Sequence, residues 1–331
     1  MKKFDVCGMG NGLLDIFVEC TEAEFAPLNF ERGTMRLVDG ADQRALLKRF
    51  ADRSPVMVSG GSVANSIIAL SQLGGKPAFI GSFGDDEFGA FYRREFDDLG
   101  IRLNRSVASP EDTGTCVAII TPDAERTMRT NLGAAALLTP DHVEEDLIAG
   151  SEWVFVEGYL FSNPGNGQPT VRRALESARR HGTRVAVTCS EAWVIQGFGD
   201  ALGEAVESSS LVFANESEAM ALSGRSSPDG AFEALCERLP GVVVTRGEAG
   251  ALVKFGDVKG SVDAFPCSPR DLTGAGDMFA GAFLYGVNHG VSPLEAARGA
   301  CYLAMHVVSR VGARLHHGAR GLWDDCLAGR V

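Results

Sequence analysis

The sequence lacks the motifs that mark several large enzyme classes. It contains no GxxxxGK[ST] loop and no HRD or DFG sequence, which excludes P-loop enzymes and protein kinases. The HExxH pattern of zinc proteases and the GxSxG pattern of serine hydrolases are also absent. The first apolar run leads into Gly8-Met9-Gly10-Asn11-Gly12 instead of GxGxxG, so a dinucleotide-dependent oxidoreductase is disfavoured.

Long hydrophobic runs and metal-ligand spacings are missing as well. No apolar run is long enough to span a bilayer, and Asp5 and Asn11 interrupt the segment after the basic start, so no signal peptide is expected. The 8 cysteines form no CxxC pair and no Cys/His cluster with zinc-ligand spacing. Scattered cysteines with apolar neighbours predict reduced core residues in a cytoplasmic protein.

Positive charge is in short supply, because 31 Lys and Arg residues face 43 Asp and Glu residues, for a formal net charge of -12. An acidic surface repels nucleic-acid backbones and anionic lipid, so neither nucleic acid nor a membrane is an expected partner. Any nucleotide site must therefore be locally positive or rich in backbone N–H donors.

What the sequence does contain is an alternation of short apolar runs and helix-like segments. Such β-α units predict one α/β domain over residues 1–331, with a central, mostly parallel sheet flanked by helices on both faces. Residues at about 13–38 and 113–131 break the alternation, since Gly, Pro and Asp rather than helices separate their apolar runs. We expect them to form a small β-sheet lid. The expected strands are 4–9, 78–81, 153–157, 185–188, 211–214 and 241–245, and the expected helices are 63–73, 88–99, 170–181, 277–286 and 294–308.

The strongest chemical signal is Asp271-Leu272-Thr273-Gly274-Ala275-Gly276-Asp277, which precedes an apolar helix. Three small residues at a helix start leave backbone N–H groups bare at the positive end of the helix dipole, where an anion is stabilised. Asp277 then lies in the first turn, where a carboxylate can take a proton from a hydroxyl that attacks a phosphoryl group. By spacing alone, a helix N-cap explains Asp277 equally well.

A second signal is Ser59-Gly60-Gly61-Ser62-Val63-Ala64-Asn65. Paired glycines permit the close approach of a ligand, and Asn65 offers a donor and an acceptor one turn into the following helix. A tight turn before a helix is the simpler explanation for this motif by itself.

Two further motifs follow predicted strands. Asn215 and Glu218 share one helical face that can hold Mg²⁺-bound water, although an Asn cap with an acidic first turn is equally common. Thr245, Gly247 and Gly250 can let a loop pass under a phosphate, and a hairpin turn explains them equally well.

The order of these four motifs is more specific than any one of them. Together they resemble the ribokinase or PfkB carbohydrate kinase family, and the resemblance extends from Asp5 to about Leu315. The adenosine kinase branch looks most similar, through Gly10-Asn11-Gly12-Leu13-Leu14-Asp15-Ile16 and Phe213-Ala214-Asn215-Glu216. The chain departs from that pattern at Leu272, where Thr is usual, and in the segment 188–193.

The resemblance implies a ribokinase-like fold and a kinase that uses ATP and Mg²⁺. Asp277 would be the catalytic base, and the amides of Gly274, Ala275 and Gly276 the anion hole. The acceptor would be bound by Asn11, Asp15, Gly60, Gly61 and Asn65. The residues implied to contact ATP are Arg126, Asn215, Glu218, Thr245, Gly247 and Gly250, with Glu218 also ordering Mg²⁺ through water. Asp271 and Thr273 fall where many family members bind a monovalent cation such as K⁺.

The acceptor and the oligomeric state stay open. The acceptor of such a kinase is either a nucleoside, with adenosine first, or a sugar such as ribose or fructose. A non-catalytic ligand-binding homologue is disfavoured, because a pure binder has no need of Asp277. A lid sheet can be covered by a second copy, in a homodimer, or stand alone.

Overall fold

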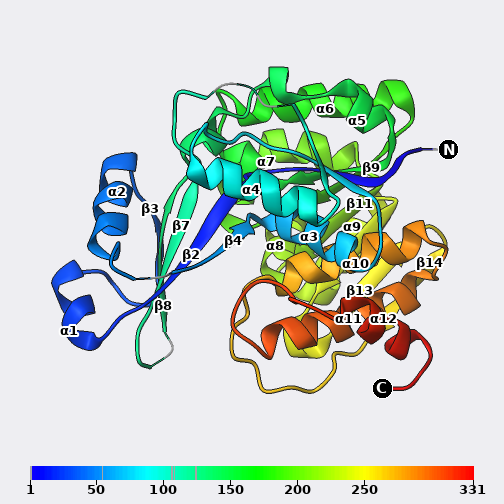
Figure 1. Ribbon diagram of the computed structural model, residues 1–331. Helices are drawn as coiled ribbons and strands as arrows, with labels where there is room; N and C mark the ends of the chain where they lie inside the picture. The colour runs from blue at the N-terminus through cyan, green and yellow to red at the C-terminus, as the bar shows by residue number, and fades with distance from the viewer. Residues whose placement is uncertain (1, 54, 106, 108, 124) are drawn as a thin grey trace.

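A nine-stranded sheet forms the centre of the molecule (Figure 1). The computed structural model describes residues 2–331 apart from 54, 106, 108 and 124. The strand order is β14-β13-β12-β11-β10-β9-β1-β5-β6; β13 and β14 pair antiparallel at one edge, and the other strands run parallel. The strands are β1 (Phe4–Met9), β5 (Pro77–Ile80), β6 (Arg102–Leu103), β9 (Ser151–Glu157), β10 (Arg184–Thr188), β11 (Leu211–Asn215), β12 (Gly241–Thr245), β13 (Ala251–Phe255) and β14 (Val258–Val262).

Helices cover both faces of this sheet, because successive side chains of a buried strand point to opposite sides. Trp153 and Phe155 of β9 pack into one core layer, and Val154 and Val156 pack into the other. The first layer lies under α3 (Ser62–Gln72), α4 (Glu87–Asp98), α10 (Ala275–Asn288), α11 (Pro293–Val308) and α12 (Ala319–Leu327). The second lies under α5 (Glu145–Ala149), α6 (Gly167–His181), α7 (Ala192–Glu207), α8 (Glu216–Ser223) and α9 (Pro228–Arg238).

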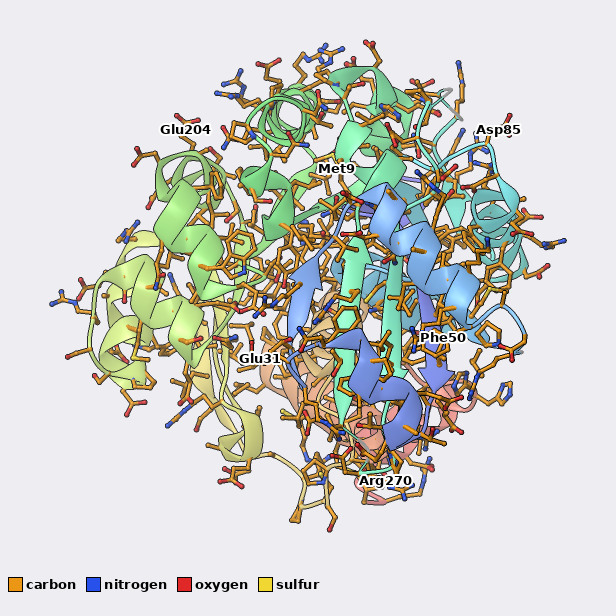
Figure 2. All side chains as sticks on the ribbon, turned by 90° about the vertical axis from the view of Figure 1, so that its left-hand side faces the viewer. Met9, Glu31, Phe50, Asp85, Glu204 and Arg270 are labelled. Atoms are coloured by element: carbon orange, nitrogen blue, oxygen red, sulfur yellow. The ribbon has the colours of Figure 1, made fainter. Side chains whose placement is uncertain are left out.

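A five-stranded sheet, called the small sheet below, stands beside this body (Figure 1). Its order is β3 (Met35–Leu37), β8 (Arg126–Asn131), β7 (Thr115–Ile120), β2 (Leu13–Glu19) and β4 (Val56–Gly60). Leu14, Ile16 and Val18 of β2 pack beneath α1 (Glu22–Phe25) and α2 (Gly40–Arg49). Figure 2 looks from that side and has α1 and α2 in front of the small sheet. The alternate residues of β2, which include Asp15 and Phe17, belong to the opposite face.

The structure confirms the predicted mostly parallel sheet between helices and the second, smaller sheet. Several strands end where the apolar runs end, among them 4–9 and 241–245. One expectation was wrong: the segment 13–38 holds the helix α1 and a 3₁₀ turn, η1 (Ala26–Leu28), so helices do interrupt its strands. The small sheet also gains β4, whose five residues lie outside the predicted ranges. In the described part of the chain, no helix is long and apolar enough to cross a membrane.

Candidate active site

The glycine-rich turn before α10 leads directly into the helix. Gly274 caps it in the left-handed region at φ 77°, and a Cβ on Gly274 would lie 2.0 Å from the carbonyl oxygen of Ala313. Only glycine fits both conditions. The helix begins at Ala275, so Asp277 is its third residue and not the N-cap. Of the three amides predicted to form the anion hole, that of Ala275 donates to the Leu272 carbonyl oxygen at 3.4 Å, and those of Gly274 and Gly276 remain available for an anion.

The carboxylate of Asp277 is held by a different helix. Oδ1 accepts a hydrogen bond from Ser62 Oγ at 2.7 Å, and Oδ2 accepts one from Asn65 Nδ2 at 3.0 Å. The two helices approach closely at Gly281, where a Cβ would lie 2.2 Å from the carbonyl oxygen of Ser66. Burial raises the pKa of Asp277 to about 6, against the opposing effect of these two donors. A carboxylate with that pKa is ionised at neutral pH and is a stronger base than an exposed aspartate.

A second carboxylate, Glu157 at the end of β9, is buried next to the same centre. It accepts hydrogen bonds from Asn11 Nδ2 at 2.8 Å and from the Val63 amide at 3.2 Å. Burial raises the pKa of Glu157 to about 7, and the charge of Asp277 adds to the rise. Sequence reasoning missed Glu157, because a single acid at a strand end carries no local pattern. Asn11, predicted to bind the acceptor, donates its side-chain amide to this carboxylate instead.

Asp15 is the third carboxylate of the group. It lies against Gly60 on the neighbouring strand, where a Cβ would be 2.3 Å from Asp15 Oδ2. Burial raises the pKa of Asp15 to about 7, with Arg314 and Arg126 opposing the rise and Asp277 adding to it. Gly61 follows at φ 108°, with the Asn11 carbonyl oxygen where a Cβ would be. The predicted acceptor residues, Asn11, Asp15, Gly60, Gly61 and Asn65, therefore surround Asp277 in one place.

Five of the six residues predicted to contact ATP form a second group at the ends of β11 and β12, and the sixth, Arg126, lies apart from them at the start of β8. Asn215 is the N-cap of α8 and exchanges hydrogen bonds with Glu218. Asn215 Nδ2 donates to Glu218 Oε1 at 2.6 Å, and the Glu218 backbone amide donates to Asn215 Oδ1 at 2.9 Å. Burial raises the pKa of Glu218 to about 7. Thr245 is paired with Asn215 across the two strands. The cap and acidic first turn that the sequence left as the alternative are thus present.

The motif after β12 is a hairpin turn. Gly247 and Gly250 have φ values of 54° and 82°, and they bracket the 3₁₀ turn η5 (Gly247–Ala249) that joins β12 to antiparallel β13. A Cβ on Gly250 would lie 2.0 Å from the Val262 carbonyl oxygen, so backbone packing already requires glycine there. This geometry needs no phosphate to explain it.

The segment 188–193, in which the chain departs from the adenosine kinase pattern, contributes Trp193 to an aromatic pair. Trp193, at the start of α7, is exposed, and its ring centroid lies 6.1 Å from that of Tyr159. Burial raises the pKa of Tyr159, and the charges of Glu191, Glu157 and Asp277 raise it further. Tyr159 therefore lies close enough to Glu157 and Asp277 for their charges to affect its pKa.

The predicted metal ligands do not gather into a metal cluster. Across the residues that the structure describes, no group of three or more His, Cys, Asp or Glu side chains could hold an ion. Mg²⁺ would accordingly depend on nucleotide phosphates and water, which is a usual arrangement for this ion. Asp271 instead pairs with Arg126, whose Nη1 lies 2.6 Å from Asp271 Oδ2.

A parallel α/β sheet with an anion-binding turn and a buried carboxylate at its edge defines a class of phosphotransferase that acts on a hydroxyl group. A model of the pfkB family of carbohydrate kinases matches residues 47–317, and the chain belongs to this family.

Individual relatives divide over the acceptor. The adenosine kinase of Saccharomyces cerevisiae is 27% identical over 307 residues, which cover 85% of this chain and 88% of that protein. A fructokinase of Solanum tuberosum is 30% identical over 229 residues, covering 68% and 70%. The crystal structure of adenosine kinase from Sinorhizobium meliloti matches with a TM-score of 0.85 at 29% identity, over 99% of each chain.

Proposed function

We propose that this kinase transfers the γ-phosphoryl group of ATP to the primary hydroxyl of a nucleoside, with adenosine the first candidate. The observation that carries the proposal is the carboxylate of Asp277, fixed by Ser62 and Asn65 in the first turn of its own helix. A base that is oriented from outside its helix can take a proton from a hydroxyl while the amides stabilise the transferring group.

Polar side chains around Asp277 suit the hydroxyls of a ribose. Asp15 can accept hydrogen bonds from two neighbouring hydroxyls. The space at Gly60 and Gly61 is taken by the Asp15 carboxylate and the Asn11 carbonyl oxygen, so these glycines position Asp15 and the loop before β2. Asn65 donates its amide to Asp277, so its carbonyl oxygen is the group that can accept from the substrate. The acceptor hydroxyl would then be held directly against the base.

The inner face of the small sheet favours a nucleoside over a free sugar. The strand register puts a set of mainly apolar side chains on the same face as Asp15: Phe17, Met35, Leu37, Val56, Val58, Ala118 and Met128. Met35, Leu37 and Val56 are exposed. A nucleobase buries two apolar ring faces on such a surface, whereas a sugar with hydroxyls on every side would leave them unpaired. The aromatic pair Tyr159 and Trp193 offers further stacking area.

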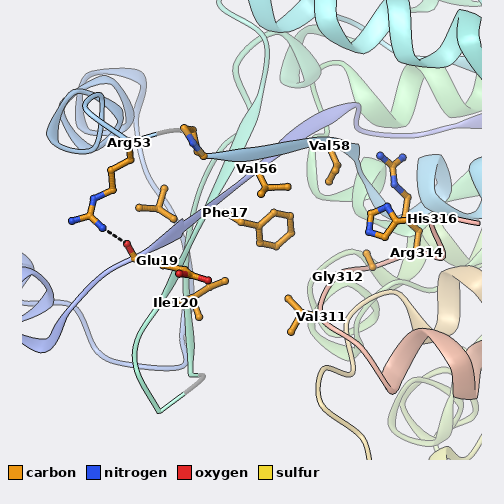
Figure 3. Close-up of a pocket in the computed structure, with 13 residues that line it drawn as sticks. Phe17, Glu19, Arg53, Val56, Val58, Ile120, Val311, Gly312, Arg314 and His316 are labelled. Carbon is orange, nitrogen blue, oxygen red and sulfur yellow. Dashed lines mark hydrogen bonds between the residues drawn. The ribbon is translucent and has the colours of Figure 1, made fainter.

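A cavity of about 580 Å³ opens between this face and the segment 311–316 (Figure 3). Phe17 and Val58 line it from the small sheet, and Val311, Arg314 and His316 line it from the body. A volume of this size accommodates a nucleoside-sized ligand, but Asp15, Asn65 and Asp277 are not among the residues that line it. The small sheet would act as a lid that closes over the acceptor and excludes water, which limits wasteful hydrolysis of ATP.

On the nucleotide side, Asn215, Glu218, Thr245 and the hairpin glycines would line ATP, with Glu218 ordering water on Mg²⁺. Arg126 Nη2 is buried and has no hydrogen-bond partner among the described residues, so it is the guanidinium nitrogen left for a phosphate oxygen. Asp277 takes the proton from the acceptor hydroxyl as that oxygen attacks the phosphoryl group.

A sugar is the second candidate, because the similarity to fructokinases equals or exceeds that to adenosine kinases in percent identity. Release of ADP should be measured with adenosine, inosine, guanosine, ribose and fructose at equal concentration. We expect adenosine to give the highest kcat/KM, and the Asp277→Asn variant to reveal any contaminating kinase. A higher kcat/KM for ribose or fructose would overturn the nucleoside assignment and leave the phosphotransfer intact.

A further inference from the structure

The carboxylate of Asp271 is fully engaged by donors of the protein itself. Oδ1 accepts from the Thr273 hydroxyl at 2.8 Å and from the Thr273 amide at 3.2 Å. Oδ2 accepts from the Gly312 amide at 2.7 Å and forms the 2.6 Å ion pair with Arg126 Nη1. A monovalent cation needs oxygen lone pairs, and here each oxygen already has two donors. The residues implied as a K⁺ site therefore do not fit K⁺ as the side chains stand.

Arg126 comes from the other sheet. It is the first residue of β8 in the small sheet, and its guanidinium lies over the Phe17 ring, 5.4 Å from the ring centroid. Its side chain is 13% exposed and that of Asp271 is 6% exposed, so the ion pair is largely desolvated. Since an unpaired buried charge is costly, the two groups depend on each other in this arrangement.

We infer that the guanidinium of Arg126 takes the place of a monovalent cation at Asp271, as a built-in positive charge that orders the anion-binding turn. Asp271 fixes the turn through Thr273 and Gly312, and Arg126 neutralises the carboxylate that does so. The turn is thereby ordered without an added ion. Arg126 is in this respect a positioning residue, acting through Asp271 on the amides that precede Asp277.

The inference predicts that the wild-type chain is insensitive to K⁺. The activity measurement rests on the proposed phosphotransfer, whereas the melting temperature tests the cation site without any substrate. KCl and tetramethylammonium chloride should be compared at about 100 mM, where the two salts screen charges alike. We expect kcat/KM for ATP to differ by less than about twofold between the salts, and the melting temperature of the substrate-free protein to show no K⁺-specific rise.

Removing the guanidinium of Arg126 should make the protein depend on K⁺. In Arg126→Ala, K⁺ can reach Asp271, so we expect KCl to raise kcat by about fivefold or more over tetramethylammonium chloride, with saturation, and to raise the melting temperature. Arg36→Ala is the matched control, because Arg36 lies on the adjacent strand β3 and pairs only with Glu31 at 2.7 Å among the described residues. It should respond to K⁺ no more than the wild type does.

Three results would overturn the inference. The first is a K⁺-specific stabilisation or activation of the wild-type chain. The second is an Arg126→Ala variant that folds and shows no K⁺ response in either measurement. The third is an equal response in Arg36→Ala. If Arg126→Ala fails to fold, the melting temperature of the wild type in the two salts still tests the inference. Arg126→Lys, which keeps the positive charge, should then remain insensitive to K⁺. A chain without any phosphotransfer would refute the proposed function and leave the melting arm interpretable.

Discussion

Two acidic residues occupy the same position in two different helices but differ in what they bind. Glu218 is the third residue of α8, and Asp277 is the third residue of α10. Glu218 folds back onto its own helix start, where Asn215 donates to both of its oxygens. Asp277 makes no such contact and is held by Ser62 and Asn65 of α3.

The residue at the N-cap accounts for the difference. Asn215 has extended backbone and a side chain that exchanges hydrogen bonds with Glu218, which is a reciprocal capping box. Gly274 has no side chain and a left-handed backbone, so it offers Asp277 nothing to bind. A locally satisfied acid contributes mainly to helix stability, whereas an acid left over by its own helix can be oriented for chemistry by a neighbouring element.

The largest expected effect is at Asp277. Asp277→Asn should lower kcat by roughly 100- to 10,000-fold, the usual contribution of a positioned general base. The fold should persist, because the Ser62 hydroxyl can turn to accept from the new amide. Steady-state ADP release and thermal melting would measure the two effects. Turnover near that of the wild type would show that Asp277 has only a structural role.

Glu218→Gln is the matched change in the other helix. Glutamine keeps one acceptor of the capping box, but its amide nitrogen would face the second Asn215 donor, so the free energy of unfolding should fall by up to about 1 kcal/mol. If Glu218 orders water on Mg²⁺, kcat/KM should fall by about 10- to 100-fold, and a higher Mg²⁺ concentration should recover part of it. Glu218→Ala removes the whole carboxylate side of the capping box, while Asn215 still accepts from the backbone amide at 218, and it should cost about 1 to 2 kcal/mol. Unchanged Mg²⁺ dependence in Glu218→Gln would reduce Glu218 to a helix cap.

This contrast also marks how far sequence reasoning reaches. The apolar run at 241–245 and the glycine turn before Asp277 are local signals: the structure has the strand at the predicted residues and starts the helix at Ala275, two residues before the predicted 277. The partners of Asp277 could not be predicted, because they depend on the packing of α3 against α10 at Gly281. Glu157 could not be predicted for the same reason, since its hydrogen-bond partners come from a loop and a helix far away in the sequence.

The Arg126 and Asp271 pair is a further case in which only the fold brings two residues together. Arg126 begins a strand of the small sheet, and Asp271 precedes a helix of the body. The motif around each residue carries no information about the other. The sequence patterns therefore named both residues as candidates but did not predict the ion pair between them.

A smaller effect concerns stability against pH. The pKa of Glu157 is raised from 4.5 to about 7, and that of Asp15 from 3.8 to about 7. The folded state thus binds these two protons more tightly than the unfolded state does. Proton binding therefore stabilises the fold fully below about pH 4, and this contribution to the free energy of unfolding is lost as pH rises through 7. The melting temperature should fall between pH 5.5 and pH 8, and the fall should be smaller in Glu157→Gln. An equally steep fall in that variant would assign the linkage to other groups.

The smallest expected effect is on the acid limb of activity. Asp277 must be deprotonated to act, so the rate should decline as pH falls through about 6, in the direction opposite to stability. Ser62→Ala removes a donor that lowers this pKa, and the limb should move to higher pH, with a loss of a few-fold near pH 6 and little change at pH 8. Ser66→Ala, one turn further along α3, removes a hydroxyl that bonds the Ser62 carbonyl and should leave the limb in place. A limb that moves equally in both variants would mean that helix packing, and not the hydrogen bond to Asp277, sets the pKa of the base.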